Sequence, residues 1–104
     1  MKYSVIIPVY NRPDEIAELL GSLARQTFTD FEVIVVEDGS SVKCEDIARQ
    51  YDGNFKVKYL FKENGGPAMA RNHGAMQAEG EYLLILDSDT VLPDRKSTRL
   101  NSSH

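Results

Sequence analysis

Four short apolar segments constrain this chain more than any other feature of its sequence. They lie at residues 3–9, 31–37, 57–61 and 82–86, and are rich in Val, Ile, Leu, Tyr and Phe. Three of them are nearly continuous apolar runs, which is typical of strands in a parallel sheet covered by helices on both faces. The third alternates with polar residues at its start, so we expect it at an edge of the sheet.

The stretch between the first two apolar segments has the spacing of one helix face. Its apolar residues recur at i, i+3, i+4, i+7 and i+8: Ile16, Leu19, Leu20, Leu23 and Ala24. Pro13 suits the first helical position, and Asp14 and Glu15 place negative charge at the positive end of the helix dipole. A helix is therefore expected to begin here.

Two further helices are expected between the later strands. One runs from about Val42 to Tyr51, with Ser40 and Ser41 as its caps. The other runs from Pro67 to Ala78 and is closed by Gly80. The alternation of strands and helices predicts an α/β fold with a Rossmann-like parallel sheet and flanking helices. Ligands bind such sheets beyond the carboxyl ends of the strands, so the polar residues that follow the strands should converge there.

Bulk composition narrows the classes of function. The 104 residues suffice for one domain at most, and 41% hydrophobic with 27% charged residues is typical of a soluble globular protein. A net charge of -4 argues against a nucleic-acid-binding surface. A membrane span requires about 18 consecutive apolar residues, and the sequence contains no such run. Cys44 is the single cysteine, which fits a reducing cytoplasm, although a longer protein containing this chain would have room for a membrane anchor.

The last ten residues differ from the rest. Residues 95–104 contain one apolar residue and no periodicity, and they resemble the translation of a sequencing adaptor. We therefore expect residues 1–94 to form the functional domain and residues 95–104 to be a non-native or disordered tail. A genuine flexible terminus is the alternative. His104 lies in this tail and is given no role.

An acidic pair follows the last apolar run. Asp87 and Asp89 are separated by one residue at the end of a strand, so both carboxylates can face one hard cation. Mg²⁺ or Mn²⁺ is typically held by one or two carboxylates, with water and substrate phosphates completing its shell. The alternative is that these residues only form the turn after the strand.

Polar and aromatic residues also follow the first two strands. Asp38, beside Gly39, could accept a hydrogen bond from a base or a ribose hydroxyl, or else cap a helix. Tyr10 could stack on a base and Arg12 could contact phosphate, or either could cover the start of the helix. Glu37 is expected to point to the other side of the strand.

The third helix begins after two glycines, with Arg71 about one turn in. Helix N-termini attract anions, and a guanidinium matches phosphate or a base edge. The segment fits neither a Walker loop nor a dinucleotide fingerprint. His73 is interpreted as an exposed or packing residue, and Cys44 as a small packing residue.

Four blocks of this sequence, in their order and spacing, resemble those of family 2 glycosyltransferases. They are Ser4–Arg12 (SVIIPVYNR), Val35–Ser41 (VVEDGSS), Asn64–Asn72 (NGGPAMARN) and Leu84–Asp89 (LILDSD). The resemblance spans residues 3 to about 94. One departure is Glu37, where many members have Asp.

The resemblance implies a partial GT-A fold that binds a nucleotide-diphosphate sugar, with a UDP-sugar favoured, and transfers the sugar to an acceptor hydroxyl, usually with inversion. The implied substrate-binding residues are Pro8, Val9, Tyr10, Arg12, Asp38, Arg71 and Asp87. Of these, Asp38 would hold the base and Arg71 would support the nucleotide. Asp87-Ser88-Asp89 would be the DxD motif, with Asp89 the principal ligand of Mn²⁺ or Mg²⁺ and Asp87 beside it.

In this family the acceptor site and the catalytic carboxylate follow the metal motif. The chain ends shortly after Asp89, so we expect it to contain no catalytic base and to be an incomplete enzyme. The acceptor, whether a glycan, a lipid-linked sugar or another molecule, is left open. Two other classes remain as alternatives: a non-catalytic nucleotide-sugar-binding module, and a receiver-like signalling domain. A receiver should have its acidic pair after the first strand, where this chain has Tyr10, Asn11 and Arg12.

Overall fold

Strands and helices alternate along the chain as predicted. The computed structural model describes residues 2–26 and 30–86. The elements are β1 (Tyr3–Val9), α1 (Pro13–Ala24), β2 (Phe31–Asp38), α2 (Glu45–Gln50), β3 (Lys56–Lys62), α3 (Pro67–Met76) and β4 (Tyr82–Ile85). The four strands form one sheet in the order β3-β2-β1-β4, and every pair is parallel. The predicted α/β class is confirmed, and β3 lies at an edge as expected.

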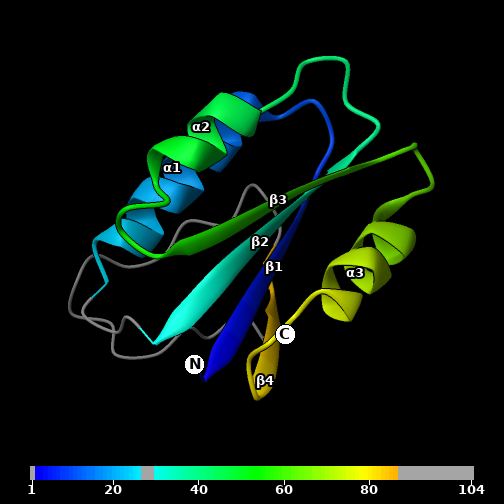
Figure 1. The fold of residues 1–104 in the computed structure, drawn as a ribbon. Helices are drawn as coiled ribbons and strands as arrows, with labels where there is room; N and C mark the ends of the chain where they lie inside the picture. Colours follow the sequence, from blue (N-terminus) through cyan, green and yellow to red (C-terminus); the bar gives the residue numbers. More distant parts are fainter. Residues whose placement is uncertain (1, 27–29, 87–104) are drawn as a thin grey trace.

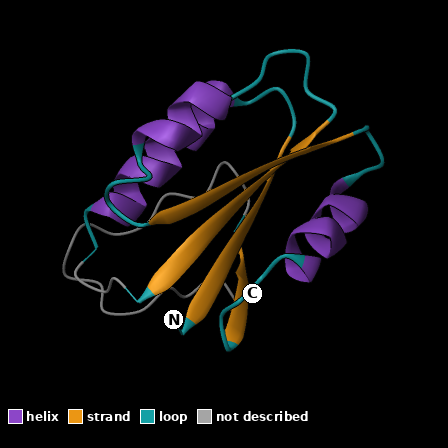
Figure 2. Cartoon of the chain, viewed as in Figure 1, coloured by secondary structure: helices purple, strands orange, loops and turns teal. Residues whose placement is uncertain are grey.

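Helices cover both faces of the sheet (Figures 1 and 2). α1 and α2 lie on one face and α3 lies on the other. Successive side chains of a strand point to opposite faces, so Val5 and Ile7 of β1 pack with the α1 side of the core, whereas Ile6 packs with Ala70 of α3. All eight residues of β2 are buried, which explains its almost continuous apolar sequence.

α3 approaches the sheet closely because Gly74 faces it. A Cβ atom at this position would lie 2.7 Å from Cγ2 of Ile6 and 3.0 Å from Cγ2 of Val36. Such contacts are too short for a side chain without a shift of the helix. The glycine therefore lets α3 pack directly on β1 and β2.

Two helix boundaries differ from the sequence expectation. α2 begins at Glu45 rather than Val42, and Ser40 and Ser41 are not its caps. The backbone N–H groups of Ser41 and Val42 instead donate to the side chain of Asn11, which holds this segment outside the helix. α3 ends at Met76 instead of Ala78. Gly80 does not close it, because Gly80 packs against β1.

The described part of the chain contains no helix that is both long and apolar enough to cross a membrane. Cys44 is buried and free, which agrees with its interpretation as a packing residue. Asp87, Asp89 and the predicted tail at residues 95–104 lie outside the described residues.

Candidate functional site at the carboxyl ends of the strands

The loops that follow β1, β2 and β3 lie together at the carboxyl ends of these strands (Figure 1). We call this end of the sheet the carboxyl rim. We define the rim as residues 10–12, 38–42 and 62–66, together with the first turn and a half of α3, residues 67–71. Two side chains, Asn11 and Asp38, connect these segments. The convergence that the sequence predicted is confirmed for the three loops.

Asn11 ties the first loop to the second. Its backbone has a φ of 54°, in the left-handed region that asparagine tolerates better than most residues. Its Oδ1 accepts hydrogen bonds from the backbone N–H groups of Ser41 (2.8 Å) and Val42 (3.0 Å), and its own N–H donates to Oγ of Ser40 (2.8 Å). These three hydrogen bonds connect the two loops directly.

Asp38 ties the second loop to the third. Its Oδ1 accepts hydrogen bonds from Nζ of Lys62 and from the N–H of Gly65, both at 2.9 Å. Its Oδ2 accepts one from the N–H of Gly66, also at 2.9 Å. The carboxylate, only 5% exposed as a residue, thus sets the entry to α3.

These contacts also decide the charge of Asp38. Burial opposes ionisation, but the hydrogen bonds from Lys62, Gly65 and Gly66 outweigh it and hold the pKa of Asp38 below its ordinary value. Gly39 beside it has a φ of +74°, and a Cβ there would lie 2.6 Å from the backbone nitrogen of Asn64. Only glycine fits between the second and third loops.

Glu37 points to the opposite face from Asp38, as expected. Its Oε1 accepts hydrogen bonds from the N–H of Cys44 (2.7 Å) and the hydroxyl of Tyr59 (2.8 Å). Burial, together with the Glu37 carboxylate, raises the pKa of both the Cys44 thiol and the Tyr59 hydroxyl. Cys44 is therefore a thiol with little nucleophilic character. Glu37 holds the segment that follows the second loop through its hydrogen bond with the N–H of Cys44.

Several predicted site residues leave their side chains exposed at or near the rim. Tyr10 is 53% exposed, and the Arg12 side chain is 62% exposed with a loose contact of 3.7 Å to Glu15. Arg71 lies on α3 and has no hydrogen-bond or ion-pair partner among the described residues. The half-exposed ring of Tyr10 suits a base, and the exposed Arg12 and the partly buried, unpaired Arg71 carry guanidinium groups that suit phosphates.

The remaining predicted residues behave differently. Val9 is 2% exposed and packs in the core beneath α1, so only its backbone is available at the rim, and Pro8 is half-buried. His73 is partly buried in the last turn of α3. Among residues 2–26 and 30–86, no group of three His, Cys, Asp or Glu side chains could hold a metal ion. The metal prediction therefore depends on Asp87 and Asp89.

Sequence reasoning assigned no role to three residues that build the rim. Asn11 and Asn64 were recognised only as polar residues that follow strands, and Lys62 was given no part. Asn64 donates a hydrogen bond from Nδ2 to the carbonyl oxygen of Asp38 (3.1 Å). An asparagine two residues after a strand, where a left-handed residue can turn the chain, is the signal that pointed to Asn11.

Comparison with known proteins gives this geometry a context. Residues 4–101 match the model of the family described as Glycosyl transferase family 2. The chain belongs to this family. The match extends into residues 95–101, part of the segment that the sequence analysis set apart as a tail.

Curated relatives of this family 2 chain are glycosyltransferases. The chain is 48% identical over 96 residues to the poly(ribitol-phosphate) beta-N-acetylglucosaminyltransferase TarS of Staphylococcus aureus. This alignment covers 88% of the chain and 17% of TarS. The chain is also 45% identical over 92 residues to the validoxylamine A glucosyltransferase of Streptomyces hygroscopicus, covering 85% of the chain and 22% of that enzyme. The chain thus spans about a fifth of the length of these relatives.

Solved structures show the same fold. S. aureus TarS in complex with UDP superimposes with a TM-score of 0.84 at 41% identity, covering 92% of this chain and 30% of the TarS chain. TarS in complex with UDP-GlcNAc gives 0.80 at 45% identity, covering 86% and 27%. The mannosyltransferase PcManGT from Pyrobaculum calidifontis, in complex with GDP-Man and Mn2+, gives 0.84 at 28% identity, covering 91% and 29%.

Proposed function

We propose that the protein carrying this chain transfers a sugar from a UDP-sugar to an acceptor hydroxyl with inversion, and that this chain holds the nucleotide at the carboxyl rim. The observation that carries the proposal is the rim itself. Asn11 and Asp38 join the three loops after β1, β2 and β3 at the end of the sheet where α/β folds bind ligands. Support for the nucleotide comes from the TarS structures in complex with UDP and UDP-GlcNAc.

The described residues can each bind a different part of the nucleotide. Tyr10 exposes a ring that stacks on the base. Asp38 makes three hydrogen bonds, and a carboxylate has about four acceptor positions, so one remains on Oδ2 for an N–H of the base. Arg71 brings an unpaired positive charge, one turn into α3, toward the diphosphate.

We further propose that Mn²⁺ or Mg²⁺ binds with the nucleotide. Asp89, with Asp87 beside it, would hold the ion. Two carboxylates match the oxygen ligands that these hard cations prefer. When bound, the ion supplies Lewis-acid neutralisation of the charge that develops on the departing diphosphate. PcManGT, which this chain resembles at 28% identity, was solved with GDP-Man and Mn2+.

Calorimetric titration with UDP, with and without Mn²⁺, tests the proposal. The wild-type protein should bind UDP more tightly when Mn²⁺ is present, and Asp89→Ala should lose that enhancement. Asp46→Ala is the matched control, because Asp46 is an exposed aspartate on α2 and is not one of the rim residues. Unchanged metal-dependent binding in Asp89→Ala would exclude this metal site, and absence of UDP binding by the wild type would exclude the proposed function.

Transfer is distinguished from mere binding by the release of UDP. We expect the protein to release UDP from a UDP-sugar when a hydroxyl-bearing glycan or lipid-linked sugar is supplied, and the anomeric configuration of the product reports inversion. A protein that binds UDP-sugars but releases no UDP with any acceptor would instead be a nucleotide-sugar-binding module. We place the reaction in the cytoplasm, where the free thiol of Cys44 fits the reducing conditions.

A further inference from the structure

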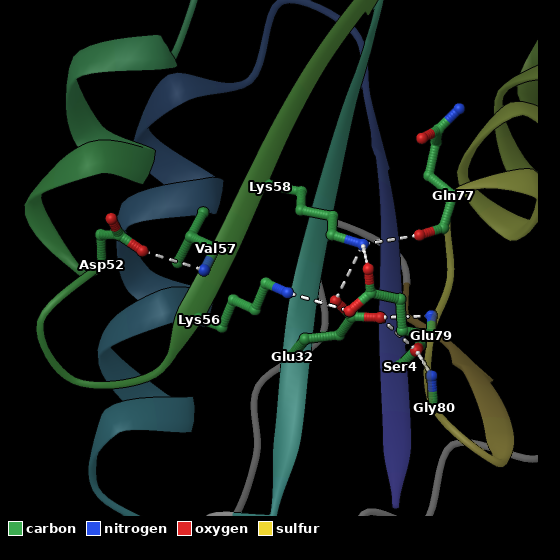
Figure 3. A network of polar contacts seen from close by, with 9 residues as sticks. All are labelled: Ser4, Glu32, Asp52, Lys56, Val57, Lys58, Gln77, Glu79 and Gly80. Atoms are coloured by element: carbon green, nitrogen blue, oxygen red, sulfur yellow. Dashed lines mark hydrogen bonds and ion pairs between the residues drawn. The ribbon is translucent and has the colours of Figure 1, made fainter. Parts of the chain in front are cut away.

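A polar cluster closes the amino-terminal end of the sheet, opposite the carboxyl rim (Figure 3). Its centre is Glu32 on β2, whose side chain is fully buried. Oε2 of Glu32 accepts hydrogen bonds from Oγ of Ser4 (2.6 Å) and from the backbone N–H of Glu79 (2.7 Å). Oε1 lies 3.2 Å from Nζ of Lys58 on β3. The cluster therefore joins β1, β2 and β3 to the segment that leads into β4.

Gly80 joins this cluster through its backbone, at a position where only glycine fits. Its N–H donates to Oγ of Ser4 (2.8 Å), so Ser4 bridges Gly80 and Glu32. A Cβ at Gly80 would lie 2.6 Å from the backbone carbon of Tyr3 and 2.7 Å from the nitrogen of Ser4. No side chain fits against the backbone of β1 at this point.

The first half of β4 does little to specify where the strand pairs, whereas Leu84 and Ile85 in the second half pack against the two core clusters. The strand has four residues, and Tyr82 and Leu83 are 55% and 48% exposed. Its backbone is held to β1 by hydrogen bonds such as those from the N–H of Tyr82 to the oxygen of Lys2 and from Leu86 to Ile6. Backbone hydrogen bonds alone do not fix the register, because a slipped ladder forms equivalent ones.

We propose that Ser4, Glu32 and Gly80 form a register lock that fixes β4 on β1 and thereby positions the segment after β4. A slip by one residue would bring Glu79 or Glu81 to the place that only Gly80 fits. It would also move the strand by about 3.3 Å and turn each side chain to the opposite face. Asp87 is separated from β4 by Leu86 alone, so under the proposed function these three act as positioning residues for the metal motif.

Hydrogen exchange of β4 tests the lock directly. Gly80→Ala should speed the exchange of amides in residues 82–86 at least tenfold, while those of β1 and β2 stay within twofold of wild type. Gly53→Ala is the matched control, because a Cβ at Gly53 meets nothing within 4 Å. Equal protection of β4 in folded Gly80→Ala and Gly53→Ala would overturn the proposal.

Ser4→Ala provides a milder variant, and it decides the question if Gly80→Ala does not fold. It removes only the hydroxyl that links Gly80 to Glu32. Ser22→Ala, at a buried serine of α1, is its control. We expect exchange of residues 82–86 to rise at least fivefold in Ser4→Ala and to stay unchanged in Ser22→Ala. Unchanged exchange in both would contradict the lock.

A binding split separates positioning from a general loss of structure. In Ser4→Ala, the Mn²⁺ concentration that gives half-maximal enhancement of UDP binding should rise at least fivefold, while UDP affinity without metal stays within twofold. Equal losses with and without metal would show that the cluster only supports the fold. If wild-type protein fails to bind UDP, the proposed function fails, but the exchange experiment still tests whether the lock exists.

Discussion

The two ends of the sheet use the same kinds of residues for opposite purposes. At the amino-terminal end, Glu32, Lys58, Lys56 and Glu79 neutralise one another through ion pairs of 2.9 to 3.4 Å. At the carboxyl rim, Arg71 has no such partner among the described residues. All four charges at the amino-terminal end are therefore paired, whereas the rim contains both a paired set, Asp38 with Lys62, and the unpaired Arg71. The comparison therefore separates structural polar groups from functional ones.

A buried carboxylate organises each end. Burial opposes ionisation of Glu32, but hydrogen bonds from Ser4, the Glu79 N–H and Lys58 outweigh it and lower its pKa. Asp38 is held ionised in the same way by Lys62, Gly65 and Gly66. Both carboxylates gather backbone N–H groups from a segment far away in sequence. What differs is their position, since Asp38 lies at the carboxyl ends of the strands, where ligands bind α/β sheets, and Glu32 lies at the opposite end.

The largest expected effect is on stability, at the amino-terminal end. Glu32→Ala should lower the free energy of unfolding by about 3 kcal/mol, because it leaves Lys58 and the N–H of Glu79 without their buried partner. Glu79→Ala should cost much less, because its pairs with Lys56 and Lys58 involve a side chain that is 58% exposed. Urea unfolding checks both. Equal losses would remove the contrast between a buried and an exposed carboxylate.

The next effect is on binding, at the rim. Arg71→Ala should weaken UDP binding about tenfold, equivalent to about 1.4 kcal/mol, while the free energy of unfolding changes by less than about 0.5 kcal/mol. Arg49→Ala, on the exposed side of α2, is the control and should leave UDP affinity unchanged. Calorimetry and urea unfolding of both variants measure the two quantities. If Arg71→Ala is destabilised and binds UDP normally, Arg71 belongs to the structural group.

A smaller effect is expected for the connection between the first two rim loops. Asn11→Ala should cost about 1 kcal/mol of stability, since it removes the acceptor for Ser41 and Val42 and puts alanine at a φ of 54°. Asn11→Asp keeps an acceptor oxygen and should recover at least half of that loss. Thermal unfolding distinguishes the two substitutions. An equal loss in both would mean that the hydrogen bonds to Asn11 contribute nothing.

The smallest effect is the dependence of stability on pH. The folded-state pKa values of Glu32 and Asp38 lie below their ordinary values of 4.5 and 3.8, so the unfolded chain binds protons first as the pH falls. Their contribution to stability is complete above these ordinary values and is lost as the pH falls through the lower, folded values. Urea unfolding from pH 6 to pH 3 should show this loss, and Glu32→Gln should reduce it. A loss of the same size in Glu32→Gln would assign it to other groups.

The sequence predicted the framework because burial leaves a direct mark on composition. β2 is buried along its whole length and reads as a continuous apolar run, and β3 alternates because it lies at an edge. Pro13 and Pro67 begin their helices as expected. The parallel pairing of the strands also followed from their alternation with helices. The α/β fold was therefore accessible from local patterns alone.

The contacts between distant segments were not accessible in this way. The sequence around Ser40 and Ser41 is typical of helix caps. In the structure both residues instead form hydrogen bonds with Asn11, about 30 residues earlier in the chain, at the rim. The position of Gly80 is typical of a residue that ends a helix, yet in the structure this glycine packs against the backbone of β1. The acidic residue Asp38 was recognised as a site candidate, but its contacts with Gly65 and Gly66 depend on how two loops meet. The roles of Asp87 and Asp89 stay predictions.

Hydrogen exchange with mass spectrometry in the presence of saturating UDP and Mn²⁺ tests the central claim most directly, because it compares both ends of the sheet in one experiment. UDP should slow exchange in peptides that cover the rim, residues 10–12, 38–42 and 62–71. It should leave peptides at the amino-terminal end, around Glu32, Lys58 and Glu79, unchanged. Protection at the amino-terminal end without protection at the rim would contradict the assignment of the nucleotide site.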